Sequence, residues 1–207
     1  DVPNPQCVYS GIPKSVAMGA PRRQVTRLLY VGTLRRTKNI HVALEALAAV
    51  RSDTPLTFEI VGAGEYEAEL RGMVGELGLS DLVTFVGRVP HADVFQHMRA
   101  ADCLVMVSKE SFGMVYVEAM SQGSLVVAAK GQGIDGVVVD GVNGFLVELD
   151  DIDALTQVFR RLAAMSQSDV ERVSRNALAT AERMRSPTLA RDLLVRLRAA
   201  AEERDAG

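Results

Sequence analysis

The sequence predicts an α/β fold, a doubly wound and Rossmann-like parallel sheet with a helical C-terminal tail. Between residues 27 and 147, short apolar runs alternate with segments of helical period, and glycine-containing loops follow most of these runs. From residue 151 onward the period is helical throughout. Because right-handed crossovers place helices over both faces of a parallel sheet, we expect the alternating part to form one covered sheet.

Each apolar run is short enough for a buried strand. In chain order, the expected strands are Arg27–Val31, Leu56–Val61, Val83–Val86, Cys103–Val107, Leu125–Ala128 and Phe145–Val147. The expected helices of the alternating part lie at 40–50, 66–77 and 93–100, with one more between the strands at 103–107 and 125–128. Three tail helices are expected at 151–164, 168–184 and 188–204.

Composition shifts divide the chain into three parts. Residues 1–26 are rich in proline and have no helical period, so we predict an extended lead-in or hinge-like linker. Residues 27–164 form the predicted Rossmann-like domain. Residues 165–207 are rich in alanine and arginine and too polar for a separate core, so these helices are expected to pack on the sheet or on a domain absent from this chain.

The bulk composition excludes several classes of protein. Of the 207 residues, 48% are hydrophobic and 24% are charged, as in a soluble globular domain, and the net charge of −3 gives no support for nucleic acid as a partner. Cys7 and Cys103 are the only cysteines, and histidines 41, 91 and 97 share no metal-ligand spacing, so no metal site is predicted. No signal-like or membrane-spanning run occurs, which favours a cytoplasmic location.

The segment at 110–118 contains two carboxylates, Glu110 and Glu118, on either side of Gly113. If a helix begins near Gly113, its free N–H groups prefer an anion. Carboxylates accept hydrogen bonds from hydroxyl groups, so the pair suits a ligand that carries both phosphate and sugar. Glutamate on a wet helix face is the alternative, but the neighbouring apolar residues favour a covered helix, where a carboxylate needs a partner.

The loop from Gly32 to Lys38 follows the first expected strand and contains three cations. Gly32 would allow close approach of the backbone to a ligand, and Lys38 with one of the arginines, Arg35 or Arg36, could neutralise a diphosphate. A solvated basic turn is the alternative interpretation of this loop.

Two further glycine-rich loops are ambiguous. Gly62 and Gly64 have a Gly-x-Gly spacing, but Glu67 occupies the position of the third glycine in a dinucleotide fingerprint. A tight turn is therefore favoured over a nicotinamide-dependent oxidoreductase. The segment 131–136 has three glycines, which could expose N–H groups to a phosphate or sugar or could form a flexible loop.

The segment from Glu110 to Met120 resembles the E-x7-E signature of retaining glycosyltransferases of the GT-B fold, in the large family-4 group. Segments similar to other motifs of that family's C-terminal domain occur in the same order, at 30–39, 60–64, 85–89 and 140–147. The resemblance covers about residues 8 to 163. In that family this domain binds a nucleoside diphosphate sugar, so the resemblance implies a donor-binding domain and no cofactor.

The resemblance also implies roles for individual residues. Glu110 and Lys38 are the implied catalytic residues, with Glu110 on the donor sugar and Lys38 on the diphosphate, while Glu118 would bind the ribose. The implied donor-binding set is completed by Gly32, Thr33, Arg35, Gly87, Arg88, Val89, Ser111, Phe112, Gly113, Met114 and Val115. The segment 87–89 would lie against the nucleobase. The family often has arginine where this chain has Thr33, so Arg35 or Arg36 would replace it.

A complete enzyme of this kind has an N-terminal domain of comparable size that holds the acceptor. The segment 7–13 resembles the hinge between the two halves, so we expect a donor domain of a longer or split enzyme that transfers no sugar by itself. An acceptor sugar, lipid or small molecule would bind the missing half, which could also contact the inner face of a membrane. The alternative from another class is a non-catalytic module that senses a sugar nucleotide or regulates a partner.

Overall fold

The computed structural model of the protein describes residues 17–185. A six-stranded parallel sheet with the order β3-β2-β1-β4-β5-β6 lies at its centre. The strands are β1 (Arg27–Val31), β2 (Thr57–Val61), β3 (Val83–Gly87), β4 (Cys103–Met106), β5 (Leu125–Ala129) and β6 (Phe145–Val147). The predicted α/β fold is confirmed, and every predicted strand is present with ends shifted by no more than one residue.

Six α-helices surround the sheet within the described residues. They are α1 (Ile40–Ala48), α2 (Glu67–Glu76), α3 (His91–Ala100), α4 (Met114–Ser121), α5 (Ile152–Ala164) and α6 (Gln167–Arg185). Helix α3 begins two residues before the predicted start because Pro90, at its N-cap, already has a φ of −58° suited to a helix entry. The short 3-10 helix η1 (Arg36–Lys38) was not predicted. The helix expected at 188–204 and the hinge-like segment 7–13 lie outside the described residues.

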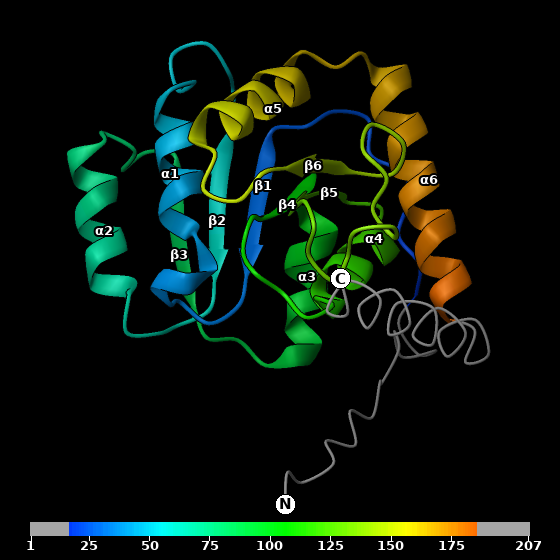
Figure 1. Cartoon of the computed structure of the whole chain (residues 1–207), viewed down its shortest axis with the longest axis horizontal. Coiled ribbons are helices and arrows are strands. Elements are labelled where there is room, and N and C mark those ends of the chain that lie inside the picture. The colour runs from blue at the N-terminus through cyan, green and yellow to red at the C-terminus, as the bar shows by residue number, and fades with distance from the viewer. Residues whose placement is uncertain (1–16, 186–207) are drawn as a thin grey trace, which may run out of the picture.

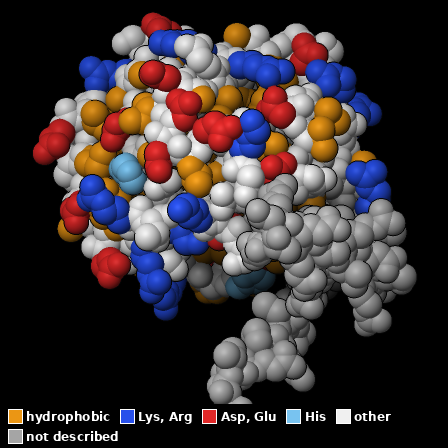
Figure 2. Space-filling view, in the orientation of Figure 1, with side chains coloured by type: hydrophobic (Ala, Val, Ile, Leu, Met, Phe, Trp, Pro, Cys, Tyr) orange, Lys and Arg blue, Asp and Glu red, His pale blue; other side chains and the backbone are white. Residues whose placement is uncertain are grey.

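The helices form two layers on the sheet (Figure 1). Helix α1 packs beside α2 and α5 in one layer, while α3 and α4 contact each other and the strands β1, β4 and β5 in the other. Helix α6 packs along α4 and touches β5, so this part of the tail shares the core of the sheet. Figure 2 shows acidic and basic side chains interspersed over the face in view, which fits the small net charge of −3.

Strands β4 and β5 are the most completely buried strands of the sheet. Every residue of β4 and β5 is buried, as expected for parallel strands covered on both faces. Cys103 in β4 is one of these buried residues, and burial raises the pKa of its thiol. Apolar burial of this kind is the main favourable contribution to folding, and it fixes the strand ends from which the loops emerge.

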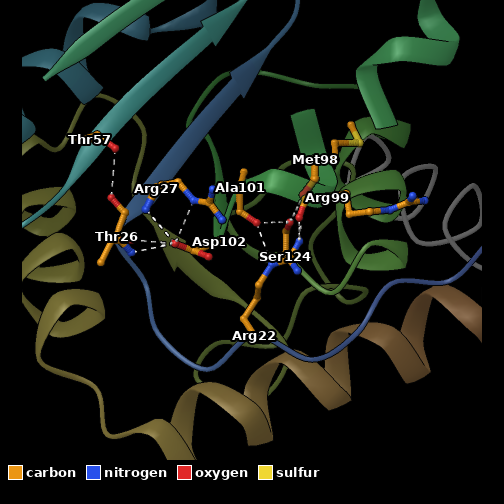
Figure 3. Close-up of polar contacts among 9 residues, drawn as sticks. All are labelled: Arg22, Thr26, Arg27, Thr57, Met98, Arg99, Ala101, Asp102 and Ser124. Carbon is orange, nitrogen blue, oxygen red and sulfur yellow. Dashed lines mark hydrogen bonds and ion pairs between the residues drawn. The ribbon is translucent and has the colours of Figure 1, made fainter. Parts of the chain in front are cut away.

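Residues 17–26 contain no helix or strand, but they are anchored to the domain. The Arg22 guanidinium donates to the carbonyls of Met98, Arg99 and Ala101 at 3.1, 2.7 and 2.8 Å. These carbonyls lie at the C-terminal end of α3, where the last carbonyl groups of a helix have no hydrogen-bond donor within the helix (Figure 3). Arg22 therefore caps α3 from a segment 76 to 79 residues away in the chain.

Asp102 provides a second anchor for the lead-in, at the entry to the sheet. Its Oδ2 accepts hydrogen bonds from the backbone N–H groups of Thr26 and Arg27 at 3.0 and 2.9 Å (Figure 3). The carboxylate is nearly buried, so these bonds compensate its loss of water. The start of β1 is thereby held against β4.

In the part of the chain that the structure describes, every helix is too short or too polar to cross a bilayer.

Candidate functional site

The strand order places the candidate site at one edge of the sheet. Strands β1 and β4 are neighbours, yet the chain leaves them in opposite directions, since β1 is followed outward by β2 and β4 by β5. Ligands of doubly wound sheets bind beyond the carboxyl ends of the strands at such a switch point. The loops that meet there are 32–39 after β1 and 107–113 after β4, the two loops that the sequence predicts to carry charge.

Lys38 and Glu110 meet at this switch point. The Lys38 Nζ lies 2.6 Å from Glu110 Oε1, and the Ser108 hydroxyl donates to the same oxygen at 2.7 Å. The Lys38 side chain is 27% exposed and the Glu110 side chain 15%. A partly buried pair is screened less than a surface pair, and its carboxylate has one oxygen fully engaged. The site therefore holds one cation and one anion in a fixed relation.

Two buried tyrosines lie beneath these loops. The Tyr30 hydroxyl donates to the Thr33 carbonyl at 3.0 Å, and the Tyr116 hydroxyl donates to the Met106 carbonyl at 2.6 Å. Burial, and then the charge of Glu110, raise the pKa of both phenols. Both tyrosines therefore stay neutral donors that hold the end of β4 and the loop after β1 in place.

Helix α4 begins directly after the loop that carries Glu110. Its N-cap residue Gly113 has φ 75° and ψ 66°, in the left-handed region that favours glycine. Because glycine has no side chain, the N-cap residue makes no side-chain capping bond to the helix. The first N–H groups of α4, at Met114 and Val115, have no partner within the helix. The turn can therefore present amide donors and the positive end of the helix dipole to an anion.

Glu118 lies in the second turn of α4, with 14% of its side chain exposed. Its Oε1 is 3.4 Å from Nε2 of His91, the first residue of α3. The His91 ring packs edge-on against Phe95, with ring centroids 5.6 Å apart. The expected partner of this carboxylate thus comes from the segment that follows Gly87–Val89, which brings the predicted nucleobase segment close to Glu118.

Two glycine loops have steric roles at the same edge. A Cβ on Gly62 would lie 1.8 Å from the Gly32 carbonyl oxygen, so glycine lets the loops after β1 and β2 touch. A Cβ on Gly133 would lie 1.6 Å from the carbonyl oxygen of Ser111, and the Gly133 N–H donates to the Glu110 carbonyl at 3.1 Å. These contacts favour the turn interpretation for the loop after β2, and they make the loop after β5 a support for the Glu110 loop.

The two arginines of the first loop point to different surroundings. Arg36 lies 3.4 Å from Glu69 and sits 5.6 Å from the centre of the Tyr66 ring, so it is turned toward α2. Arg35 is exposed and has no ion-pair partner among residues 17–185. Arg35 is therefore the more available cation beside Lys38.

Metal-binding residues do not cluster in the described part of the chain: no group of three or more His, Cys, Asp or Glu side chains between residues 17 and 185 could hold an ion.

Sequence reasoning missed several residues of this site. Ser108, Asn39 and His91 contact Glu110, the end of β4 and Glu118, respectively. Ser108 and Asn39 had local signals, because Ser108 lies two residues before Glu110 in the same loop and Asn39 ends the motif segment 30–39. The contacts of Asn39 and His91 depend on strand order and helix packing, which local patterns do not specify. Among the predicted residues, the structure brings Lys38 and Glu110 together directly and joins Glu118 to the segment after Gly87–Val89 through His91.

The doubly wound sheet with charged loops at its switch point defines the class of protein: a Rossmann-like domain that binds its ligand beyond the carboxyl ends of the strands. Residues 19–180 match the family described as glycosyl transferases group 1. The chain belongs to this family.

Individual relatives agree with this assignment. The chain is 39% identical, over 58% of its length, to a D-inositol 3-phosphate glycosyltransferase of Geodermatophilus obscurus, of which it covers 29%. Among solved structures, Anabaena Alr3699/HepE in complex with UDP and glucose matches with a TM-score of 0.72 and 28% identity, over 89% of this chain and 49% of that one.

A third comparison concerns the fold alone. The C-terminal domain of a group 1 glycosyl transferase, LpcC of Francisella tularensis, matches with a TM-score of 0.74 and 24% identity, over 83% of this chain and 97% of that one. The chain thus spans one domain of the fold and less than half of the two longer relatives.

Proposed function

We propose that this chain is the donor-binding half of a retaining glycosyltransferase that moves a sugar from a nucleoside diphosphate to an acceptor. Because the chain covers only 29% of the related D-inositol 3-phosphate glycosyltransferase, the proposal assigns the acceptor site to another domain. The acceptor is a sugar, lipid or small molecule. A cytoplasmic location, with contact of the other half to the inner membrane face, forms part of the same proposal.

One observation carries the proposal: the ion pair of Lys38 and Glu110 at the switch point, 2.6 Å apart and beside the start of α4. An ammonium, a carboxylate and free amides in one place suit a ligand with phosphate and hydroxyl groups. The solved relative that holds UDP and glucose supports the same ligand class here.

On this proposal the ligand is divided among the loops. Lys38 binds the diphosphate, and Glu110 accepts hydrogen bonds from the donor sugar. The ribose hydroxyls bind Glu118, and the nucleobase lies against the segment Gly87–Val89, which leads into the helix of His91. The backbone at Ser111–Met114 faces the sugar and the phosphates.

The diphosphate requires more than one compensating group. Like charges about 4 Å apart repel by roughly 4 kcal/mol at an effective dielectric near 20, so two carboxylates beside two phosphates need cations. Lys38, the exposed Arg35 and the start of α4 are the groups available. Arg35 takes the role of the arginine that the family often has at the position of Thr33. We therefore propose a metal-independent site in which these groups stabilise the leaving diphosphate.

Isothermal calorimetry on this chain with UDP, GDP and ADP tests the nucleotide part. We expect weak binding of at least one of them and no sugar transfer by the chain alone. Glu118→Gln should weaken binding by about tenfold, the effect of roughly one charged hydrogen bond. Glu148→Gln is the matched control, because that carboxylate is 63% exposed and pairs with the exposed Lys130. Absence of binding to all three nucleotides, or equal effects of the two variants, would refute the assignment.

The sugar part needs a second titration, with a nucleoside diphosphate sugar against the bare nucleoside diphosphate. Glu110→Gln should remove the difference in affinity between the two ligands. A longer protein that contains both halves then decides between transfer and sensing. Sugar transfer with retained anomeric configuration supports the enzyme, whereas binding without transfer in that protein favours a non-catalytic module.

A further inference from the structure

Asn39 follows Lys38 directly and has an uncommon backbone conformation. Its φ of 53° and ψ of 29° lie in the left-handed region, and Asp150, with φ 60°, is the other non-glycine residue with positive φ in residues 17–185. Side chains other than asparagine and aspartate rarely adopt this region. The two unusual residues are joined by a hydrogen bond from Asn39 Nδ2 to Asp150 Oδ1 at 2.8 Å, across 111 positions of the chain.

The same amide nitrogen makes a second bond. Asn39 Nδ2 also donates to the carbonyl of Val107 at 3.0 Å, directly after β4. An amide NH₂ group has two hydrogens, so both are used between loops. Although Asn39 occupies the N-cap position of α1, its side chain makes no capping bond to that helix. Its amide is therefore committed to the loops after β4 and β6 and not to the helix that it precedes.

Lys38 and Asn39 thus connect the same pair of loops side by side. Lys38 reaches Glu110 in the loop after β4, and Asn39 reaches Val107 at the start of that loop. If the backbone of Asn39 left the left-handed region, the direction of the chain would change at the position next to Lys38. The bond to Asp150 opposes that change by fixing the Asn39 side chain from a third loop.

We propose that Asn39 is a positioning residue for Lys38, held in its left-handed conformation by Asp150, and that it sets the diphosphate-binding geometry of the proposed donor site. This inference rests on the proposed function for its ligand. Asn39 itself touches no phosphate on this proposal; it acts through the lysine.

Variants that keep the backbone conformation separate positioning from folding. Asn39→Gly and Asp150→Gly both tolerate positive φ but lose the bridge. Each should weaken UDP binding by about tenfold, the scale of one hydrogen bond to a charged group. In a Lys38→Ala background, Asn39→Gly should weaken binding by less than about twofold, because the group that it positions is gone. Asn176→Ala is the control: it removes the hydrogen bond from Asn176, on α6, to the Val142 carbonyl and should leave UDP affinity unchanged.

If Asn39→Gly still weakened UDP binding by about tenfold in the Lys38→Ala background, the proposal would be overturned, and Asn39 would have a general structural role. Hydrogen exchange without ligand gives an independent readout. Asn39→Gly should speed exchange at the N–H groups of Lys38 and Gly133, which bond the Arg35 and Glu110 carbonyls at 2.9 and 3.1 Å. Unchanged exchange at both would overturn the proposal as well. If the unaltered chain binds no nucleotide, the donor assignment fails, and exchange still decides whether Asn39 orders the loop of Lys38.

Discussion

The ammonium group of Lys38 lies 2.6 Å from the carboxylate of Glu110, although 72 residues separate them in the chain. The contact exists because β1 and β4 are neighbours in the sheet and release their loops at the same edge. A diphosphate that binds Lys38 competes with Glu110 for the ammonium group. The Glu110 carboxylate can then accept hydrogen bonds from the sugar hydroxyls. The two residues are therefore expected to respond differently to substitution.

Lys38→Ala should weaken binding of a nucleoside diphosphate by about 10- to 100-fold, the range for losing a partly buried charged contact. Lys130→Ala is the control, because the Lys130–Glu148 pair is 2.9 Å long but both side chains are at least 60% exposed. Exposed pairs contribute little, so that variant should bind UDP as before. Calorimetry with UDP compares the two, and similar losses for both lysines would contradict a specific role for Lys38.

Gly133→Ala should also impair binding, although no ligand contact is assigned to this residue. Its Cβ would lie 1.6 Å from the Ser111 carbonyl oxygen, which is backbone and must move together with the Glu110 loop. Gly75→Ala in α2 meets nothing within 4 Å and should stabilise the protein by about 0.5–1 kcal/mol. Calorimetry and urea unfolding on both variants provide the measurement. Normal UDP affinity in Gly133→Ala would show that the loop after β5 does not support the site.

The sheet could be predicted because its strands carry strong local signals. The runs at β4 and β5 are apolar without interruption, which is typical of parallel strands covered on both faces. The short helix η1 was missed because three residues are too few to show a period. The start of α3 was misplaced by two residues, since His91 and Ala92 add little to the apolar pattern that begins at Val94.

The site was predictable only in part, for a related reason. Glu110 and Lys38 stand in loops after strands, and a parallel sheet gathers such loops at one edge. Which loops become neighbours depends on strand order, so the partner of Glu118 and the bridge from Asn39 to Asp150 could not be derived from local patterns. The sequence also left Arg35 and Arg36 equivalent, and only the packing of α2 turns Arg36 toward Glu69.

Arg22→Ala should lower the free energy of unfolding by about 1.5–3 kcal/mol, the range for hydrogen bonds that involve a charged group. Its guanidinium caps three carbonyls at the end of α3, and burial lowers its pKa, an effect that Asp102 opposes. Arg23→Ala, at the next position, removes a side chain that is 75% exposed and pairs with Glu171 at 3.4 Å. Its effect should stay below about 1 kcal/mol. Urea unfolding compares the two, and equal losses would mean that the cap does not anchor the lead-in.

His41 should make stability depend on pH. Its Nδ1 is buried and has no hydrogen-bond partner among the described residues, and the ring lies edge-on to Tyr66 with centroids 5.9 Å apart. Burial, followed by the nearby charge of Arg36, lowers the pKa of this imidazole below 6.5, although Glu45 and Asp150 oppose the shift. The neutral ring is therefore favoured in the folded state.

The sign of the pH effect follows from this lowered pKa. Well above pH 6.5 the His41 ring is neutral in both the folded and the unfolded state, so its titration does not change stability there. As the pH falls below 6.5, the unfolded chain takes up the proton first, so the free energy of unfolding decreases until the folded pKa is passed. Urea unfolding at about pH 7.5 and about pH 5.5 should therefore show a larger loss for the unaltered chain than for His41→Gln, in which this titration is absent. An equal or larger loss in His41→Gln would exclude His41 as a source of acid sensitivity.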